Sequence, residues 1–306
     1  MTGISPPSVP DLSRLFNALP PAEVLDRVLD CLAELPAHHA PDDEIYQHLA
    51  DVSRKAAKEV FGPSGPQTGR LGSLGAIRLP YTPMGAIDSV DLFGLDELII
   101  FAFYRANRDR YRRVVDAGAN LGLHSIMMSR CGFEVRAYEP DPIHFQALLD
   151  NLEHNDCTSV VAQPTALSTA ADKRDFIRVL GNTTGSHLAG SKETVYGPTD
   201  VFQVETEPFA PLLEWADLVK MDVEGHEAAI LRSTTPEQWA RTDALVEVGS
   251  ARNATDIFAH FAGTGINLFA QKLSWGRVIR SRDMPSSYRE GSIFLTCKES
   301  MPWPTN

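Results

Sequence analysis

The chain has 306 residues, 43% of them hydrophobic and 22% charged, a composition typical of a globular protein with one large or two smaller domains. Its 28 lysines and arginines are outnumbered by 40 aspartates and glutamates, giving a net charge of −12. Nucleic acid is therefore not expected as a partner, because binding it requires Lys and Arg to neutralise phosphates. The longest apolar run, Leu98 to Tyr104, is too short to cross a bilayer, so no membrane association is expected either.

The N-terminal residues and the cysteines favour a cytoplasmic location. Residues 1–10 lack the charged and then apolar pattern of a secretory signal. The four cysteines contain no CxxC pair, so neither a zinc site nor a disulfide framework is indicated. We expect reduced, buried thiols at Cys31, Cys131, Cys157 and Cys297.

The first sixty residues are predicted to be helical. Apolar residues at helical spacing predict one helix around residues 12–19 and a second around 24–32, and a third is expected to begin at the acidic residues 42–44. Residues 62–72 contain four glycines and two prolines and predict a linker or exposed loop. We interpret residues 1–72 as a helical cap with its linker. The alternative is a substrate lid or an arm through which the chain forms a homo-oligomer.

Residues 73–306 are predicted to form the main domain, of the α/β class. A short helix is expected at residues 96–106, followed by alternating strands and helices, with Asp141 and Pro142 opening one of the helices. Alternation at this spacing predicts a mainly parallel sheet covered on both faces. Two further strands with little helix between them predict an antiparallel edge. The expected strands are residues 111–116, 134–139, 159–163, 218–222, 245–248, 267–271 and 292–297.

The strongest local signal is the turn Asp116-Ala-Gly-Ala-Asn-Leu-Gly122, which directly follows a predicted strand and opens a helix. Gly118 and Gly122 permit a ligand to approach the backbone closely, and Asn120 tolerates a left-handed backbone. Glu139 lies 21 residues after Gly118, at the end of the second strand, where a carboxylate accepts both hydroxyls of a ribose. This combination predicts an adenosine-containing cofactor, with a purely structural turn as the alternative.

The charge of the turn distinguishes between cofactors. A dinucleotide site has the pattern G-x-G-x-x-G, which lets a pyrophosphate rest on a helix N-terminus. This turn instead begins with the carboxylate of Asp116 and spaces its small residues differently. A negative charge at the end of the first strand suits a cationic ligand. We therefore predict S-adenosylmethionine, which carries a sulfonium and an ammonium group.

A second group of charged residues follows the fourth strand, in Leu218-Val-Lys-Met-Asp-Val-Glu-Gly-His-Glu227. In open α/β sheets, ligands bind outside the carboxyl ends of the strands, where Asp222 and Glu224 are expected. A carboxylate there can orient or deprotonate an acceptor hydroxyl, and His226 is the alternative base. The competing interpretation is that Glu224 and Glu227 only favour a helix N-terminus and that His226 is solvated.

Glu247, at the end of the fifth strand, is expected beside Asp222 if the fourth and fifth strands are neighbours. Carboxylates gathered there could hold Mg²⁺ through oxygen ligands. Their spacing matches no fixed metal motif, so no metal site is predicted, and a divalent ion stays an alternative.

Other patterns carry weaker predictions. Residues 181–187 form a polar loop of a kind that contacts substrate or cofactor but is more often only a connection. The arginines of residues 105–113 are interpreted as a solvated helix end, with docking of an anionic substrate as the alternative. His38 and His39 are interpreted as surface residues. The absence of a Gly-x-Ser-x-Gly elbow and of a P-loop lysine disfavours hydrolase and kinase activities.

Taken together, these motifs resemble the FkbM family of S-adenosylmethionine-dependent methyltransferases over about Leu74 to Lys298. The asparagine in the glycine turn and the D-x-E-G-x-E block are the more specific features. The family implies a Rossmann-like class I methyltransferase sheet, mainly parallel with an antiparallel C-terminal strand. The matching segments are residues 116–122, 138–141 with Asn151, 166–168, 182–187 and 220–227.

The resemblance also implies roles for individual residues. Glu139 would bind the ribose hydroxyls, Ala166 would lie against the adenine, and Asp222 and Glu224 would face the methyl acceptor. Members commonly methylate hydroxyl groups of sugars, polyketides and other secondary metabolites, so a small hydroxylated acceptor is the expected partner. The methionine and ribose parts of the cofactor would contact Asp116, Gly118, Ala119, Asn120 and Gly122.

Segments outside the shared motifs are expected to supply acceptor specificity. The candidates are the N-terminal helices and the loop at residues 181–199, while residues 80–88 could close over the cofactor. Two alternatives from other classes stay open. One is a nicotinamide-dependent oxidoreductase, and the other is a non-catalytic adenosine-binding protein of the same fold.

Overall fold

The computed structural model describes residues 8–192 and 197–303. Its centre is an eight-stranded sheet in the order β13-β12-β14-β11-β10-β3-β4-β5. The five strands from β11 to β5 run parallel, whereas β14 is antiparallel to both β11 and β12. The strands are β3 (Arg113–Ala117), β4 (Glu134–Tyr138), β5 (Val160–Gln163), β10 (Leu218–Met221), β11 (Asp243–Glu247), β12 (Asn267–Ala270), β13 (Gly276–Arg277) and β14 (Ser292–Thr296).

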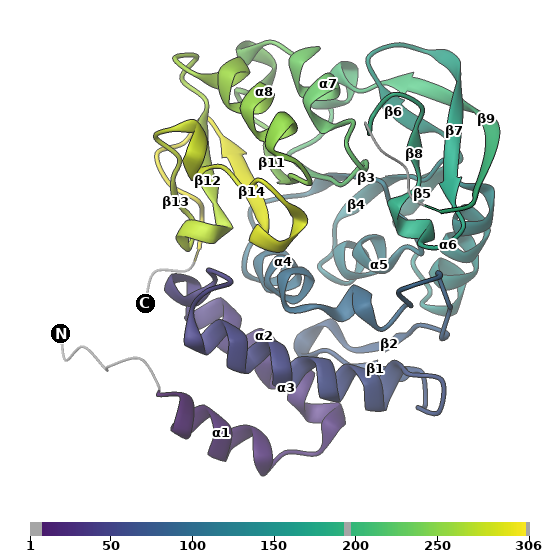
Figure 1. The fold of residues 1–306 in the computed structure, drawn as a ribbon. Helices are drawn as coiled ribbons and strands as arrows, with labels where there is room; N and C mark the ends of the chain where they lie inside the picture. The colour runs from purple at the N-terminus through teal and green to yellow at the C-terminus, as the bar shows by residue number, and fades with distance from the viewer. Residues whose placement is uncertain (1–7, 193–196, 304–306) are drawn as a thin grey trace.

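Helices cover both faces of this sheet, as Figure 1 shows. Alternation along β3 divides the core, because Val114 packs on one face with α4, α5 and α6 and Val115 packs on the other with α7 and α8. The helices are α4 (Leu95–Ala106), α5 (Leu123–Arg130), α6 (Pro142–His154), α7 (Glu227–Arg232) and α8 (Ala251–Phe261). The predicted α/β class, the mainly parallel sheet and the antiparallel C-terminal strand are confirmed.

The N-terminal helices α1 (Val9–Asn17), α2 (Pro21–Glu34) and α3 (Glu44–Phe61) form a layer outside α4 (Figure 1). Their apolar faces belong to the same buried cluster as α4 and one face of the sheet. The stretch at residues 62–72, predicted as a linker or loop, contains the strand β1 (Thr68–Arg70), which pairs antiparallel with β2 (Ala76–Arg78). No described helix combines the length and apolarity that a bilayer span requires.

The prediction that His39 lies on the surface is wrong, because its side chain is fully buried. Its Nε2 lies 3.0 Å from the carbonyl oxygen of Leu32, and its Nδ1 accepts a 2.8 Å hydrogen bond from the indole of Trp275. Burial lowers the pKa of His39 to about 4. His39 therefore ties the N-terminal helices to the C-terminal part of the sheet as a neutral imidazole.

A second, smaller sheet is inserted between β5 and β10 and was not predicted. Its strand order is β6-β9-β7-β8, with β7 antiparallel to both of its neighbours. It lies on the side of the molecule away from β12 and β13 (Figure 1). Its strands are β6 (Ala166–Ser168), β7 (Asp172–Val179), β8 (His187–Leu188) and β9 (Thr199–Pro208).

Candidate active site

A pocket lies between the carboxyl ends of the central strands and the small sheet. Seven of the ten predicted site residues line the pocket: Gly118, Asn120, Glu139, Ala166, Asp222, Glu224 and His226. No residue of the described range 8–117 lines it, so the N-terminal helices and residues 80–88 lie outside the pocket wall.

The glycine turn has the backbone geometry that its sequence predicts. Gly118 and Asn120 have φ angles of 77° and 52°, both in the left-handed region. A Cβ atom on residue 118 would lie 1.8 Å from the carbonyl oxygen of Asp222, so only glycine fits. The side-chain oxygen Oδ1 of Asn120 is buried without a hydrogen-bond partner, which leaves an acceptor at the pocket wall for a ligand donor.

The carboxylate of Glu139 is held by two main-chain N–H groups. Its Oε2 accepts a hydrogen bond from the N–H of Asn120, and its Oε1 accepts one from the N–H of Asp141, both at 2.8 Å. Burial raises the pKa of Glu139 to about 7, even though these two donors favour the charged form. The carboxylate is thus held at the pocket wall, where the ribose prediction requires it.

Three predicted cofactor residues lie behind the pocket wall. Asp116 is fully buried, accepts a 2.6 Å hydrogen bond from Ser125 and lies 3.9 Å from Nζ of Lys220. Ala119 is buried, and a Cβ atom on Gly122 would lie 2.3 Å from the side chain of Leu148. These residues do not face the pocket. They fix the shape of the glycine turn through their contacts with α5, α6 and β10.

Asp222 follows β10 and lies next to Lys220 and Glu247, since β10 and β11 are adjacent and parallel as expected. Nζ of Lys220 is 3.6 Å from Oδ2 of Asp222 and donates to the carbonyl oxygen of Gly118. Burial and the charges of Asp222 and Glu224 raise the pKa of Glu247 well above its usual range. Glu247 also hydrogen-bonds Asp222, so the two carboxyl groups are in direct contact.

Glu224 has a φ of 54°, which is uncommon for a residue other than glycine and is found preferentially at functional sites. It forms an ion pair with Lys192, whose Nζ also donates to the carbonyl oxygen of Gly185. Burial and the nearby charge of Asp222 raise the pKa of Glu224 to about 7. This pKa is suitable for accepting a proton near neutral pH.

His226 and Glu227 hold in place the turn formed by residues 222–227, here called the acidic turn. The two ring nitrogens of His226 lie 3.0 Å and 3.2 Å from the hydroxyls of Ser168 and Ser191, and burial lowers its pKa to about 4. Glu227 accepts hydrogen bonds from the N–H groups of Val223 and Gly225. His226 is buried, not solvated, and it is a weaker base than Glu224.

The region of Asp222, Glu224 and Glu247 was considered for Mg²⁺. Across residues 8–192 and 197–303, no three His, Cys, Asp or Glu side chains are grouped so that they could hold a metal ion. The carboxylates of Asp222 and Glu224 are instead engaged with the two lysines described above.

Sequence reasoning missed the small sheet as an element, although two segments that it singled out, residues 166–168 and 181–187, supply Leu167, Thr183, Thr184 and Ser186 to the pocket wall. Phe176 and Leu188, two apolar residues of the same wall, lie outside every predicted motif. The loop considered for specificity, residues 181–199, thus lines the pocket through residues 183–188, while residues 193–196 lie outside the described part of the chain. Residues 80–88 border this loop, since the N–H of Thr183 donates to the carbonyl oxygen of Met84.

The arginines of residues 105–113 lie away from the pocket. Arg113 begins β3 and Arg112 precedes it; they lie 3.9 Å and 2.9 Å from Glu134, and both side chains are exposed, as the sequence favoured. Arg105 differs, because its side chain is only 14% exposed and pairs with Asp30.

The fold and the pocket together are those of an open α/β protein whose pocket lies at the carboxyl ends of its parallel strands, with a glycine turn and an acidic residue at the ends of neighbouring strands. Comparison with known proteins is more specific: residues 116–275 match the methyltransferase FkbM domain. The chain belongs to this family, as its motifs indicated.

The individual proteins that match this chain do so over part of its length or at low sequence identity. Methyltransferase sdnD of Sordaria araneosa is 31% identical over 159 residues, a match that covers 41% of this chain and 61% of that protein's length. Cofactor-bound Rv0187 from MTB matches with a TM-score of 0.35 and 12% identity, covering 84% of this chain and 92% of that one. The methyltransferase PaMTH1 of Podospora anserina, with SAH bound, matches with a TM-score of 0.35 and 12% identity over 66% of this chain and 79% of that one.

Proposed function

We propose that this protein is an S-adenosylmethionine-dependent O-methyltransferase that acts on a small hydroxylated molecule, such as a sugar, a polyketide or another secondary metabolite. The observation that carries the proposal is that the glycine turn, Glu139 and the carboxylates of Asp222 and Glu224 all open into one pocket. Membership of the FkbM family supports the methyl-transfer chemistry. The net charge of −12 supports a small acceptor over nucleic acid.

The residues of the pocket fit this cofactor. The unpartnered Oδ1 of Asn120 offers an acceptor for an ammonium group, and Glu139 offers carboxylate oxygens for ribose hydroxyls. Ala166, Leu167 and Phe176 provide an apolar surface for the adenine. S-adenosylmethionine, when bound, supplies a methyl group on a positively charged sulfur.

The protein's part in the reaction is to place the acceptor oxygen and to accept its proton. Placing two reactants in line can lower a barrier by roughly 7–11 kcal/mol, and a positioned base adds about 10²–10⁴-fold. Asp222 can orient the hydroxyl, because its contacts with Glu247 and Lys220 fix its position. Glu224, with its pKa of about 7, lines the same pocket and can take the proton.

The cofactor assignment is tested by calorimetric titration of the protein with S-adenosylmethionine and S-adenosylhomocysteine, with NADH and EDTA-treated protein in parallel. Micromolar binding of the two adenosyl compounds alone is the expected result. Binding of NADH alone would replace the proposal with the oxidoreductase alternative.

The acceptor class is then tested by mass spectrometry on a panel of hydroxylated and amino compounds incubated with the protein and cofactor. A gain of one methyl group on a hydroxyl is expected. Cofactor binding without transfer to any compound would favour a non-catalytic adenosine-binding protein, and transfer to amines alone would rule out O-methylation.

A further inference from the structure

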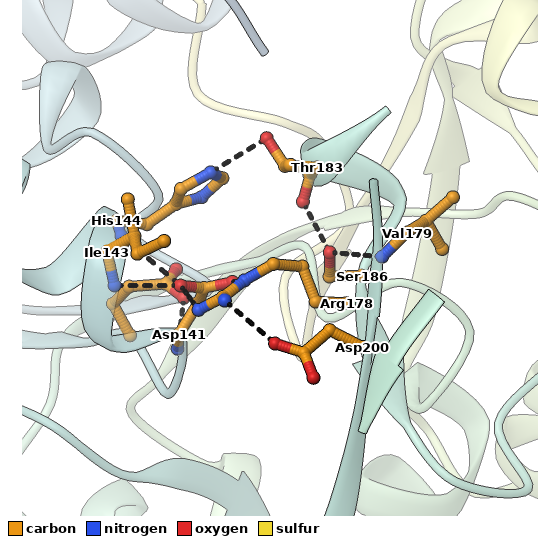
Figure 2. A network of polar contacts seen from close by, with 9 residues as sticks. Asp141, Ile143, His144, Arg178, Val179, Thr183, Ser186 and Asp200 are labelled. Carbon is orange, nitrogen blue, oxygen red and sulfur yellow. Dashed lines mark hydrogen bonds and ion pairs between the residues drawn. The ribbon is translucent and has the colours of Figure 1, made fainter. Parts of the chain in front are cut away.

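Arg178, on β7 of the small sheet, reaches across to the turn after β4 (Figure 2). Its Nε and Nη2 each donate a 2.6 Å hydrogen bond to the carboxylate of Asp141. The side chains of Arg178 and Asp141 are only 10% and 1% exposed, so the pair is shielded from solvent. The guanidinium also lies over the ring of Phe202, which fixes its plane.

Asp141 connects this pair directly to the predicted ribose ligand. Its carboxylate caps α6 by accepting from the N–H of Ile143, and its own N–H donates to Oε1 of Glu139. Holding the carboxylate of Asp141 therefore fixes the orientation of its peptide N–H, and that N–H holds Glu139.

A second contact fastens the same turn to the same sheet. Nε2 of His144, in the first turn of α6, lies 2.9 Å from Oγ1 of Thr183, and both residues line the pocket (Figure 2). The hydroxyl of Ser186 donates to the carbonyl oxygen of Thr183 and accepts from the N–H of Val179, next to Arg178. The small sheet thus contacts the segment that follows Glu139 at two residues, Asp141 and His144.

We propose that Arg178 is a positioning residue for cofactor binding, acting through Asp141 to hold Glu139 toward the ribose hydroxyls. The inference rests on the proposed function, because it assumes that the ligand contains an adenosine ribose. It assigns the small sheet a role in cofactor recognition. Neither Arg178 nor Asp141 belongs to the glycine turn or to the acidic turn.

The test is the dissociation constant of S-adenosylhomocysteine and of its 2′-deoxy analogue, measured by calorimetry on wild type, Arg178→Met and Arg178→Lys. Loss of a hydrogen-bonded charged partner predicts that Arg178→Met binds S-adenosylhomocysteine about 10- to 100-fold more weakly. The preference for the ribose over its 2′-deoxy form should shrink as well. Arg178→Lys, which keeps the charge but not the planar fork, should fall between the two.

Matched variants separate positioning from folding. Asp200, a 56% exposed second partner of Arg178 at 3.4 Å, provides the control Asp200→Asn, which should retain wild-type affinity. In a Glu139→Gln background, Arg178→Met should have little further effect on affinity, because the residue through which it acts is already altered. Circular dichroism and the melting temperature of each variant show whether it is folded.

Two results would overturn the proposal while leaving the proposed function intact. One is unchanged affinity in folded Arg178→Met, and the other is a full, additive loss in the Glu139→Gln background with no change in ribose preference. If wild-type protein binds no adenosyl compound, the proposed function and this inference both fail.

Discussion

Gly118 lies directly against the main-chain carbonyl group of Asp222, so closely that a Cβ atom on residue 118 would be 1.8 Å from that oxygen. The contact arises because β3 and β10 are adjacent, parallel and in register, with Ala117 opposite Met221, so that the turns after them meet. Lys220 adds a hydrogen bond to the carbonyl oxygen of Gly118. The glycine turn (residues 116–122) and the acidic turn (residues 222–227) are therefore packed against each other and held together.

The first prediction is that Gly118→Ala is severely destabilising and abolishes cofactor binding. The nearest neighbours are backbone atoms that cannot move aside, so overpacking should add about 1–3 kcal/mol or more to the cost of the left-handed backbone. Gly132 is the matched control, because its φ of 87° is similar and a Cβ atom on residue 132 would have no neighbouring atom within 4 Å.

Urea denaturation of Gly118→Ala and Gly132→Ala separates the free-energy cost of overpacking from the cost of the left-handed backbone. Gly132→Ala should lose only the backbone cost, about 1–2 kcal/mol, and should keep its affinity for S-adenosylhomocysteine. Equal losses of stability in the two variants would mean that the turns do not pack as described.

The second prediction concerns Asp222→Asn, which keeps the shape of the side chain but removes its charge. If Asp222 orients the acceptor, turnover should fall by about 10²-fold while cofactor affinity changes little. The control is Asp217→Asn, at the other end of the same strand, where the carboxylate accepts from the N–H groups of Arg112 and Arg113. Steady-state kinetics measures the turnover of both variants, and calorimetry measures their cofactor affinity. A parallel loss of affinity would make Asp222 a cofactor ligand, and unchanged turnover would remove it from the mechanism.

The central sheet and its turns could be predicted from sequence because their signals are local. Strands such as β3 and β10 are short apolar runs buried on both faces, and the helix start at Asp141 has a side-chain cap followed by proline. The left-handed backbone of Asn120 was likewise predictable from its residue type, since few others adopt it readily.

The small sheet could not be predicted in this way because its two longer strands, β7 and β9, are largely exposed, while the buried strands β6 and β8 have only three and two residues. Only two of the eight residues of β7 are buried, and one of them is Arg178, so its sequence lacks the apolar alternation that marks a half-buried strand. The pair of Asp141 and Arg178 joins residues 37 positions apart, and the burial of His39 depends on Trp275, 236 positions away. Contacts of this kind are set by the tertiary fold and leave no pattern in a single sequence.

The third prediction is that affinity for S-adenosylhomocysteine increases with pH through Glu139. Burial raises the pKa of Glu139 to about 7, and only the ionised form can accept from both ribose hydroxyls. The ionised fraction rises about tenfold between pH 6 and pH 8, so the dissociation constant should fall by a similar factor. Glu139→Gln should bind more weakly than wild type above pH 7, approach the wild-type affinity in mild acid, and lose this dependence. If the variant keeps the wild-type profile, another group such as Glu224, whose pKa is also about 7, is responsible.

The fourth prediction is that His39 makes the protein less stable in mild acid. Burial lowers the pKa of folded His39 to about 4, whereas an unfolded chain has a pKa of about 6.5, so between these values the unfolded state binds the additional proton. The free energy of unfolding should therefore fall with decreasing pH across this window, by at most about 1.4 kcal/mol per pH unit from this residue.

Urea denaturation from pH 4.5 to pH 8 on wild type, His39→Gln and Trp275→Phe isolates this contribution, because carboxylates with raised pKa values titrate in all three proteins. His39→Gln should be the less stable protein at pH 8, since it disturbs a buried contact, but its stability should decline less in acid. Trp275→Phe removes the indole donor and leaves His39 buried, so it should lose stability at every pH and keep the wild-type slope. Parallel curves for wild type and His39→Gln would show that His39 is protonated equally in the folded and unfolded chain, which its complete burial against Leu32 and Trp275 argues against.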